Sequence, residues 1–205
     1  MATDGLPDLL EIASFLVTGL GADLAGAVER YRFLLTLDAK FGSEFVMLPG
    51  GTASSQAYTE GRFCYVYGNF LATIVLAQSF AENLLGSHLR IQEGIKPVHG
   101  ILPRQSGNLS SRPSVREILI KSVEDGLIAE AMKDRIEKLI GLRNPLLHHR
   151  DVNDKTHIMR RSMNEDATAS DLIEEDAGFA ISVIVELAHT SMQKMIPFTG
   201  SKRGR

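Results

Sequence analysis

A regular spacing of apolar residues near the middle of the chain limits the fold more than any other feature. Between residues 128 and 142, apolar side chains recur every three or four positions and charged side chains lie between them, as on an amphipathic helix. Gly141 and Pro145 then follow, and a proline disfavours both a helix interior and the helical conformation of the residue before it. We therefore predict a helix over 128–142, a break over 141–145, and a new helix that begins at Pro145 behind an Asn144 N-cap.

Helical spacing recurs along the rest of the chain, and no segment alternates apolar and polar residues as a half-buried strand does. Segments rich in glycine, proline or polar residues separate the helical ones and indicate irregular connections. The predicted helices are 6–18, 22–41, 61–90, 114–123, 128–142 and 172–195, and the predicted connections are 42–59, 91–113 and 151–170. The sequence thus predicts an all-α helical bundle.

Side-chain chemistry adds detail to these helices. Ser114 and Glu117 have the spacing of a capping box, and Ser170 or Asp171 is expected to cap the last helix. One face of the helix at 22–41 is apolar and is expected to be buried. That face consists of Leu24, Val28, Tyr31 and Leu35.

The composition excludes several classes of protein and site. A net charge of −3 over 205 residues is not that of a generally basic nucleic-acid coat. The one cysteine, Cys64, allows no intrachain disulfide and no cysteine-based zinc site, and its apolar surroundings are typical of an inert core thiol. No histidine pair has the spacing of a helical zinc site, so we expect neither a metal nor a cofactor.

The N-terminal and apolar segments bear on where the protein is found. Residues 1–5 lack the basic start of a signal peptide. The apolar stretch at 63–80 contains too many polar residues for a membrane span and is expected to be a buried core helix. We therefore expect a cytoplasmic protein that does not enter a membrane.

The end of the predicted helix at 128–142 carries an arginine and, five residues later, a histidine. The guanidinium of Arg143 is a planar cation that matches phosphate geometry. His148 follows it, and histidine in general has a pKa of roughly 6.5, which suits proton transfer near neutral pH. A phosphate-binding cation and an acid/base group are the minimum needed to cut a phosphodiester bond without a metal. The same spacing also fits an arginine that meets backbone carbonyls and a histidine on the surface.

The chain holds further charged residues that bear on this arginine and histidine. The segment 143–161 is rich in basic side chains, which suits a phosphate substrate and is equally typical of a solvated loop. Its members are Arg143, Arg150, Lys155, Arg160 and Arg161, with His148, His149 and His157, opposed by Asp151 and Asp154. Glu82, on the long apolar helix, could hold the guanidinium of Arg143 in place or could face solvent near the helix end.

The segment 142–149, Leu-Arg-Asn-Pro-Leu-Leu-His-His, resembles the HEPN family (higher eukaryotes and prokaryotes nucleotide-binding domain). The signature of that family is an arginine, a polar residue that is often asparagine, and a histidine a few residues further on, in an all-α bundle. The resemblance implies that Arg143, Asn144 and His148 are the signature residues. His149 also fits the spacing, and Arg150 stands where some toxin members carry a tyrosine.

The resemblance implies two alternative functions. Many HEPN proteins are metal-independent endoribonucleases, often toxins or defence proteins, and two copies of the motif line one cleft of a homodimer. In such an enzyme a histidine would deprotonate a ribose 2′-OH, Arg143 would stabilise charge on the phosphate, and His148 would protonate the leaving oxygen. Asn144 would position His148 or the phosphate. The alternative is a non-catalytic HEPN-like module that binds a nucleotide, an RNA or a protein partner.

The resemblance also guides the expected partners and organisation. RNA or a nucleotide, a second copy of the chain, and an antitoxin or regulatory protein are the expected partners. We expect residues 1–60 to form N-terminal helices packed on the bundle plus a loop, and 61–195 to form the HEPN-like domain. The basic tail at 196–205 is expected to be disordered.

Overall fold

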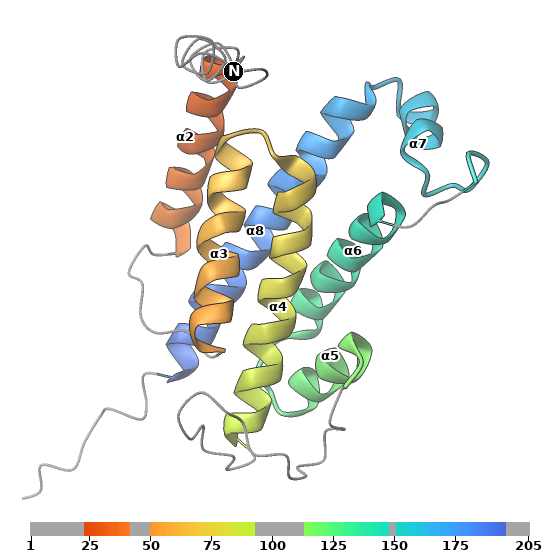
Figure 1. The fold of residues 1–205 in the computed structure, drawn as a ribbon. Coiled ribbons are helices and arrows are strands. Elements are labelled where there is room, and N and C mark those ends of the chain that lie inside the picture. The colour runs from red at the N-terminus through yellow and green to blue at the C-terminus, as the bar shows by residue number, and fades with distance from the viewer. Residues whose placement is uncertain (1–22, 42–49, 93–112, 148–150, 196–205) are drawn as a thin grey trace, which may run out of the picture.

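The structure is a computed structural model that describes residues 23–41, 50–92, 113–147 and 151–195. Within these ranges it contains seven helices and no strand, which confirms the predicted all-α bundle (Figure 1). The helices are α2 (Leu24–Phe41), α3 (Gly51–Val66), α4 (Phe70–Gln92), α5 (Val115–Glu124), α6 (Glu130–Leu147), α7 (Ile158–Glu165) and α8 (Ala169–Met195). The predicted helix at 6–18 and the tail at 196–205 lie outside the described residues, as does most of the connection at 91–113.

Helices α4 and α8 form the centre of the bundle, and each of the other described helices packs against at least one of them (Figure 1). Both are apolar on several sides because neighbours cover them on several sides. Their fully buried side chains include Ile74, Phe80, Leu84, Leu85 and Leu89 from α4, and Leu172, Ile181, Ile184 and Leu187 from α8. Among the described helices, α4 has the length and apolar content of a membrane span, a test that core helices also pass.

The predicted single helix over 61–90 is wrong, because the chain forms two helices, α3 and α4, with a turn at 67–69. Gly68 in that turn has a φ of +78°, which side chains with a Cβ rarely adopt, and the chain reverses there so that α4 packs against α3. Helix α3 also begins at Gly51, so residues 51–59 are helical and not the predicted loop. It runs across the boundary between residues 60 and 61 at which we divided the chain.

Helix α2 confirms the predicted helix at 22–41 but does not bury the predicted face. The residues that it buries are Arg30, Leu34 and Leu37, whereas Leu24, Val28, Tyr31 and Leu35 are exposed. Arg30 is only 5% exposed, and its guanidinium donates to the carbonyl oxygen of Val66 at 3.0 Å and to Glu174 at 3.2 Å. Because this inward arginine joins α2 to both α3 and α8, the apolar face of α2 is turned outward.

Of the two predicted helix caps, the one of α5 is confirmed and the one of α8 is wrong. At the start of α5, the Ser114 hydroxyl accepts from the Glu117 amide at 3.2 Å, and the Glu117 carboxylate accepts from the Ser114 amide at 2.6 Å. The predicted capping box is therefore present. Helix α8 begins earlier than predicted, and its cap is Thr168, whose hydroxyl accepts from the Asp171 amide at 3.1 Å. Asp171 is the reciprocal partner and not the cap, because its carboxylate accepts from the Thr168 amide.

Candidate nucleic-acid site at the end of helix α6

Helix α6 runs from Glu130 to Leu147 without interruption, so the predicted break at 141–145 and the predicted helix start at Pro145 are wrong. Pro145 lies in the last described turn, where its missing amide removes one hydrogen bond, the one to the carbonyl of Gly141. Gly141 is exposed, so water can bind that carbonyl instead. The proline is therefore accommodated, and Arg143 keeps the helical register of the residues before it.

That register places Arg143 at the end of the core-facing stripe of α6. Met132, Ile136 and Leu139 are buried along the stripe, and Arg143 follows Leu139 by four residues, about one helical turn. The side chain is half-buried, and its Nη1 donates to the Asn144 side-chain oxygen at 3.3 Å. No described carboxylate forms an ion pair with Arg143. The arrangement is thus a half-buried cation whose planar fork is oriented by a neighbouring amide.

The structure assigns no place to the remaining signature residues. His148, His149 and Arg150 lie outside the described residues. Glu82 is half-buried on α4, and its carboxylate accepts from the Gln78 side chain at 2.5 Å. Glu82 and Arg143 are both described, and no hydrogen bond or ion pair joins them, so the contact that we considered for this pair does not form.

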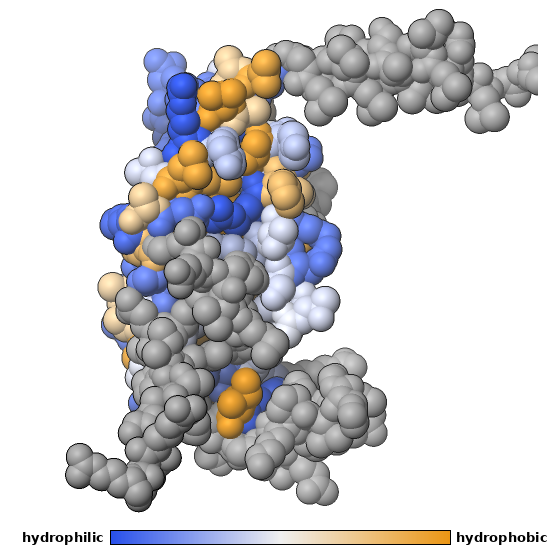
Figure 2. Space-filling model, turned by 90° about the vertical axis from the view of Figure 1, so that its left-hand side faces the viewer, coloured by the Kyte–Doolittle hydropathy of each residue, from blue (hydrophilic) through white to orange (hydrophobic). Residues whose placement is uncertain are grey.

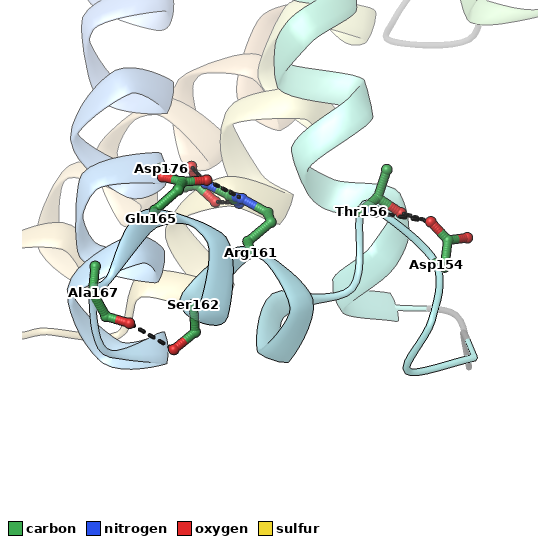
Figure 3. Close-up of polar contacts among 7 residues, drawn as sticks. All are labelled: Asp154, Thr156, Arg161, Ser162, Glu165, Ala167 and Asp176. Carbon is green, nitrogen blue, oxygen red and sulfur yellow. Dashed lines mark hydrogen bonds and ion pairs between the residues drawn. The ribbon is translucent and has the colours of Figure 1, made fainter.

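The predicted connection at 151–170 is wrong in part, because it contains helix α7 (158–165). Helix α7 lies at the same end of the bundle as the C-terminal end of α6 (Figure 1). Arg161 on α7 points toward α8, and both of its terminal nitrogens donate to the buried Asp176 carboxylate (Figure 3). Lys155 and Arg160 are exposed. Arg161 is therefore part of an internal ion pair, and the basic charge that faces solvent is smaller than the sequence suggested.

The other charged residues before α7 stabilise local structure. The carboxylates of Asp151 and Asp154 each accept from the backbone amide two residues further on, at 2.8 and 2.9 Å. Asp154 also accepts from the Thr156 hydroxyl at 2.8 Å (Figure 3). His157 is the N-cap of α7, and its Nδ1 accepts from the Met159 amide at 3.2 Å.

The residues that we set aside as chemically inactive have unremarkable surroundings. Cys64 is half-buried, and burial, with the nearby charge of Glu60, raises the pKa of its thiol. The thiol is thus held in its weakly nucleophilic, protonated form. Among the described residues, no three histidine, cysteine, aspartate or glutamate side chains are grouped closely enough to hold a metal ion.

Sequence reasoning missed a cavity of about 360 Å³ between α2 and α3. The Arg62 guanidinium in its wall binds both oxygens of Asp38, at 2.8 and 2.7 Å. The lining residues are Tyr31, Leu34, Asp38, Tyr58, Thr59, Arg62, Phe63, Val66 and Tyr67. Asp38 and Arg62 are 24 positions apart on different helices, so no local pattern indicates that they meet.

Comparison of the whole chain with known proteins finds no matching family model, no matching curated protein and no matching solved structure. The resemblance to the HEPN family therefore depends on the residues at 142–149 and on the helical fold.

Proposed function

We propose that the protein is a metal-independent endoribonuclease of HEPN type that cuts RNA through attack of a ribose 2′-OH. One observation supports this most, the half-buried Arg143 whose guanidinium is oriented by Asn144 at the end of α6. A partly desolvated guanidinium binds a phosphate more strongly than one fully in water, and an oriented fork loses less entropy on binding. The all-α bundle is the architecture expected of the family.

In the proposed reaction, a histidine accepts the proton of the 2′-OH as the oxygen attacks the adjacent phosphorus. Arg143 stabilises the negative charge that develops on the phosphate oxygens. A second histidine protonates the 5′-oxygen as its bond to phosphorus breaks. The products are a 2′,3′-cyclic phosphate and a free 5′-OH, and no metal takes part. His148 is the proposed acid/base residue, and His149 is the competing assignment.

We further propose that two subunits share each site. Helix α6 is continuous through Leu147. The direction of the Arg143 side chain is therefore set by the regular helix and is not changed by a bend. Two residues five positions apart on a straight helix differ in direction by about 140°. An arginine of one subunit and a histidine of the partner subunit can face one phosphate without such a bend.

The test is incubation of the purified protein with end-labelled RNA in the presence of EDTA. Cleavage that leaves a 2′,3′-cyclic phosphate is expected, and the same RNA with a 2′-deoxy substitution at the cut site should resist cleavage there. Cleavage that stops on chelation and returns with Mg²⁺ would contradict the mechanism. RNA that is bound but never cut, with the same affinity after His148→Ala, would favour the non-catalytic binding module.

A further inference from the structure

The surface formed by α2 and α3 exposes large apolar side chains that remain without a partner among the described residues. Figure 2 faces this side of the molecule and shows apolar side chains gathered in its upper part. The exposed apolar residues on this side are Leu24, Val28, Tyr31 and Leu35 from α2, and Phe63 and Tyr67 from α3, whereas the exposed Phe33 lies on another side of α2. We call this set the α2–α3 face. Large apolar side chains that gather on one side of a protein generally mark an interaction site.

The cavity described above opens within this face, and its chemistry suits an apolar side chain. Its charged groups, Arg62 and Asp38, are already joined by two short hydrogen bonds, and Arg62 also donates to the Tyr58 hydroxyl at 3.1 Å. Burial raises the pKa of Tyr58, so that hydroxyl stays protonated. Since these polar groups already bind one another, the interactions left to an incoming group are mainly with the walls. Those walls include Leu34, Val66 and several aromatic rings.

The chain contains a segment with the complementary pattern directly before α2. In a helical projection at about 100° per residue, most apolar residues of 4–18 fall on one side and the polar residues fall on the other. The apolar side holds Leu6, Leu9, Leu10, Ala13, Leu16 and Val17, with Ile12 at its edge. The opposite side holds Asp4, Asp8, Glu11, Ser14 and Thr18, and Phe15 is the one large apolar residue among them. An amphipathic helix of this type needs an apolar surface to cover one side.

The short connection between this segment and α2 keeps the segment within reach of the α2–α3 face. Residues 19–23, with glycines at 19 and 21, connect it to α2 and can span at most about 17 Å. A helix over 6–18 would be about 20 Å long, and α2 is about 27 Å long. Folded back antiparallel to α2, such a helix would lie beside residues 24–36. That part of α2 carries all four of its exposed apolar residues named above.

We propose that residues 6–18 form a helix that docks on the α2–α3 face and places an apolar side chain in the cavity between α2 and α3. The occupant of the face is then the chain's own N-terminal segment and not another protein. The outward turn of the apolar side of α2 is explained in the same way. This inference does not depend on the proposed nuclease activity.

The test uses single-tryptophan reporters, because the chain contains no tryptophan. Tyr31→Trp places a reporter on the face, and Val152→Trp places a control reporter at an exposed position between α6 and α7. Each reporter is combined with Leu9→Asp/Leu16→Asp on the apolar side of the segment. The matched control is Ser14→Asp/Thr18→Asp, which adds the same charge on the polar side. Acrylamide quenching and the emission maximum are measured, and far-ultraviolet circular dichroism verifies that the bundle remains folded.

We expect the reporter at position 31 to be shielded in the otherwise unchanged chain. Leu9→Asp/Leu16→Asp should increase its quenching and shift its emission to longer wavelength, whereas Ser14→Asp/Thr18→Asp should not. The reporter at position 152 should respond to neither. Equal quenching at position 31 in all three backgrounds would overturn the proposal. Shielding that is lost on dilution would also overturn it, because a second copy of the chain would then be the occupant.

Discussion

Arg161 and Asp176 form a bidentate ion pair that joins helix α7 to helix α8. The terminal nitrogens of Arg161 lie 2.6 and 3.1 Å from the two carboxylate oxygens of Asp176 (Figure 3). Asp176 is only 6% exposed, and its hydrogen bond raises the pKa of Arg161 further above the physiological range. No pattern in the sequence of α7 or of α8 indicates that this pair joins the two helices.

Asp176→Ala should therefore release α7. The change leaves the half-buried guanidinium of Arg161 without its best partner, and the loss of a charged hydrogen bond of this kind costs about 1–3 kcal/mol. Urea unfolding should show the lower stability, and the amides of 158–165 should exchange faster. Glu165→Ala is the control, because this exposed carboxylate lies 3.5 Å from Arg161 and should contribute about 0.2–1 kcal/mol. Similar losses in the two variants would contradict the assigned role of Asp176.

The capping box of α5 should make stability depend on pH. Its backbone hydrogen bond from Ser114 lowers the pKa of Glu117 in the folded protein. A carboxylate whose pKa is lower in the folded protein than in the unfolded chain stabilises the fold. That stabilisation is fully present above the pKa of the unfolded chain, about 4.3, and is lost as the pH falls through the pKa of the folded protein. Glu117→Gln can keep the hydrogen bond but cannot titrate. The difference in unfolding free energy between the two proteins should therefore change below about pH 4.3 and stay constant above it. A pH-independent difference would be inconsistent with this coupling.

The same substitution should have opposite effects at two glycines. Gly68→Ala forces a side chain into a φ of +78° at the turn between α3 and α4, which should cost roughly 1–2 kcal/mol. Gly141→Ala lies inside α6, where a Cβ meets no atom within 4 Å, and should stabilise the protein by about 0.5–1 kcal/mol. Chemical denaturation of both variants tests the pair. Destabilisation by Gly141→Ala would indicate that α6 needs the glycine next to Pro145.

Arg143→Lys should lose most RNA cleavage although the charge is retained. Lysine offers a point charge and cannot reproduce the planar fork that Asn144 orients. Arg160→Lys is the matched control, since Arg160 is exposed and lies outside the proposed site. The measurement is the initial rate at which the unchanged protein and the two variants cleave the same RNA substrate. If the lysine variant at position 143 cleaves normally, Arg143 is only a local counter-charge.

Mixed dimers should show whether two subunits share the site. His148→Ala alone should lower the rate by roughly 10²–10⁴-fold through loss of an acid/base group. Arg143→Ala alone should also be inactive, but subunit exchange between the two variants should restore part of the activity. Restoration is expected because every heterodimer keeps one site in which the Arg143 of one subunit and the His148 of its partner are both present. A protein that is monomeric by light scattering while it cleaves RNA would rule out the shared site.

Much of the local structure could be predicted from the sequence. The all-α fold follows from helical spacing, because an amphipathic segment determines its own secondary structure and requires an apolar neighbour. The capping box of Ser114 and Glu117 follows from their spacing, because the side chain of each residue bonds to the backbone amide of the other. For the candidate site, the sequence singled out Arg143 and Asn144, but it predicted Asn144 as a helix N-cap and did not indicate that its side chain accepts from Arg143 inside α6.

Only the tertiary structure decided how these helices are oriented and where they end. Arg30 turns the apolar face of α2 outward through partners on α3 and α8, and no local pattern reports bonds between residues so far apart. The turn at Gly68 lies inside an apolar run of the sequence, and the run does not reveal it because the exposed residues beside the turn, Tyr67 and Leu71, are themselves apolar. Pro145 remains helical because the carbonyl that loses its bond can reach water. Helix formation is thus decided by neighbours along the chain, whereas the choice of buried face depends on distant residues that complete one another's hydrogen bonds.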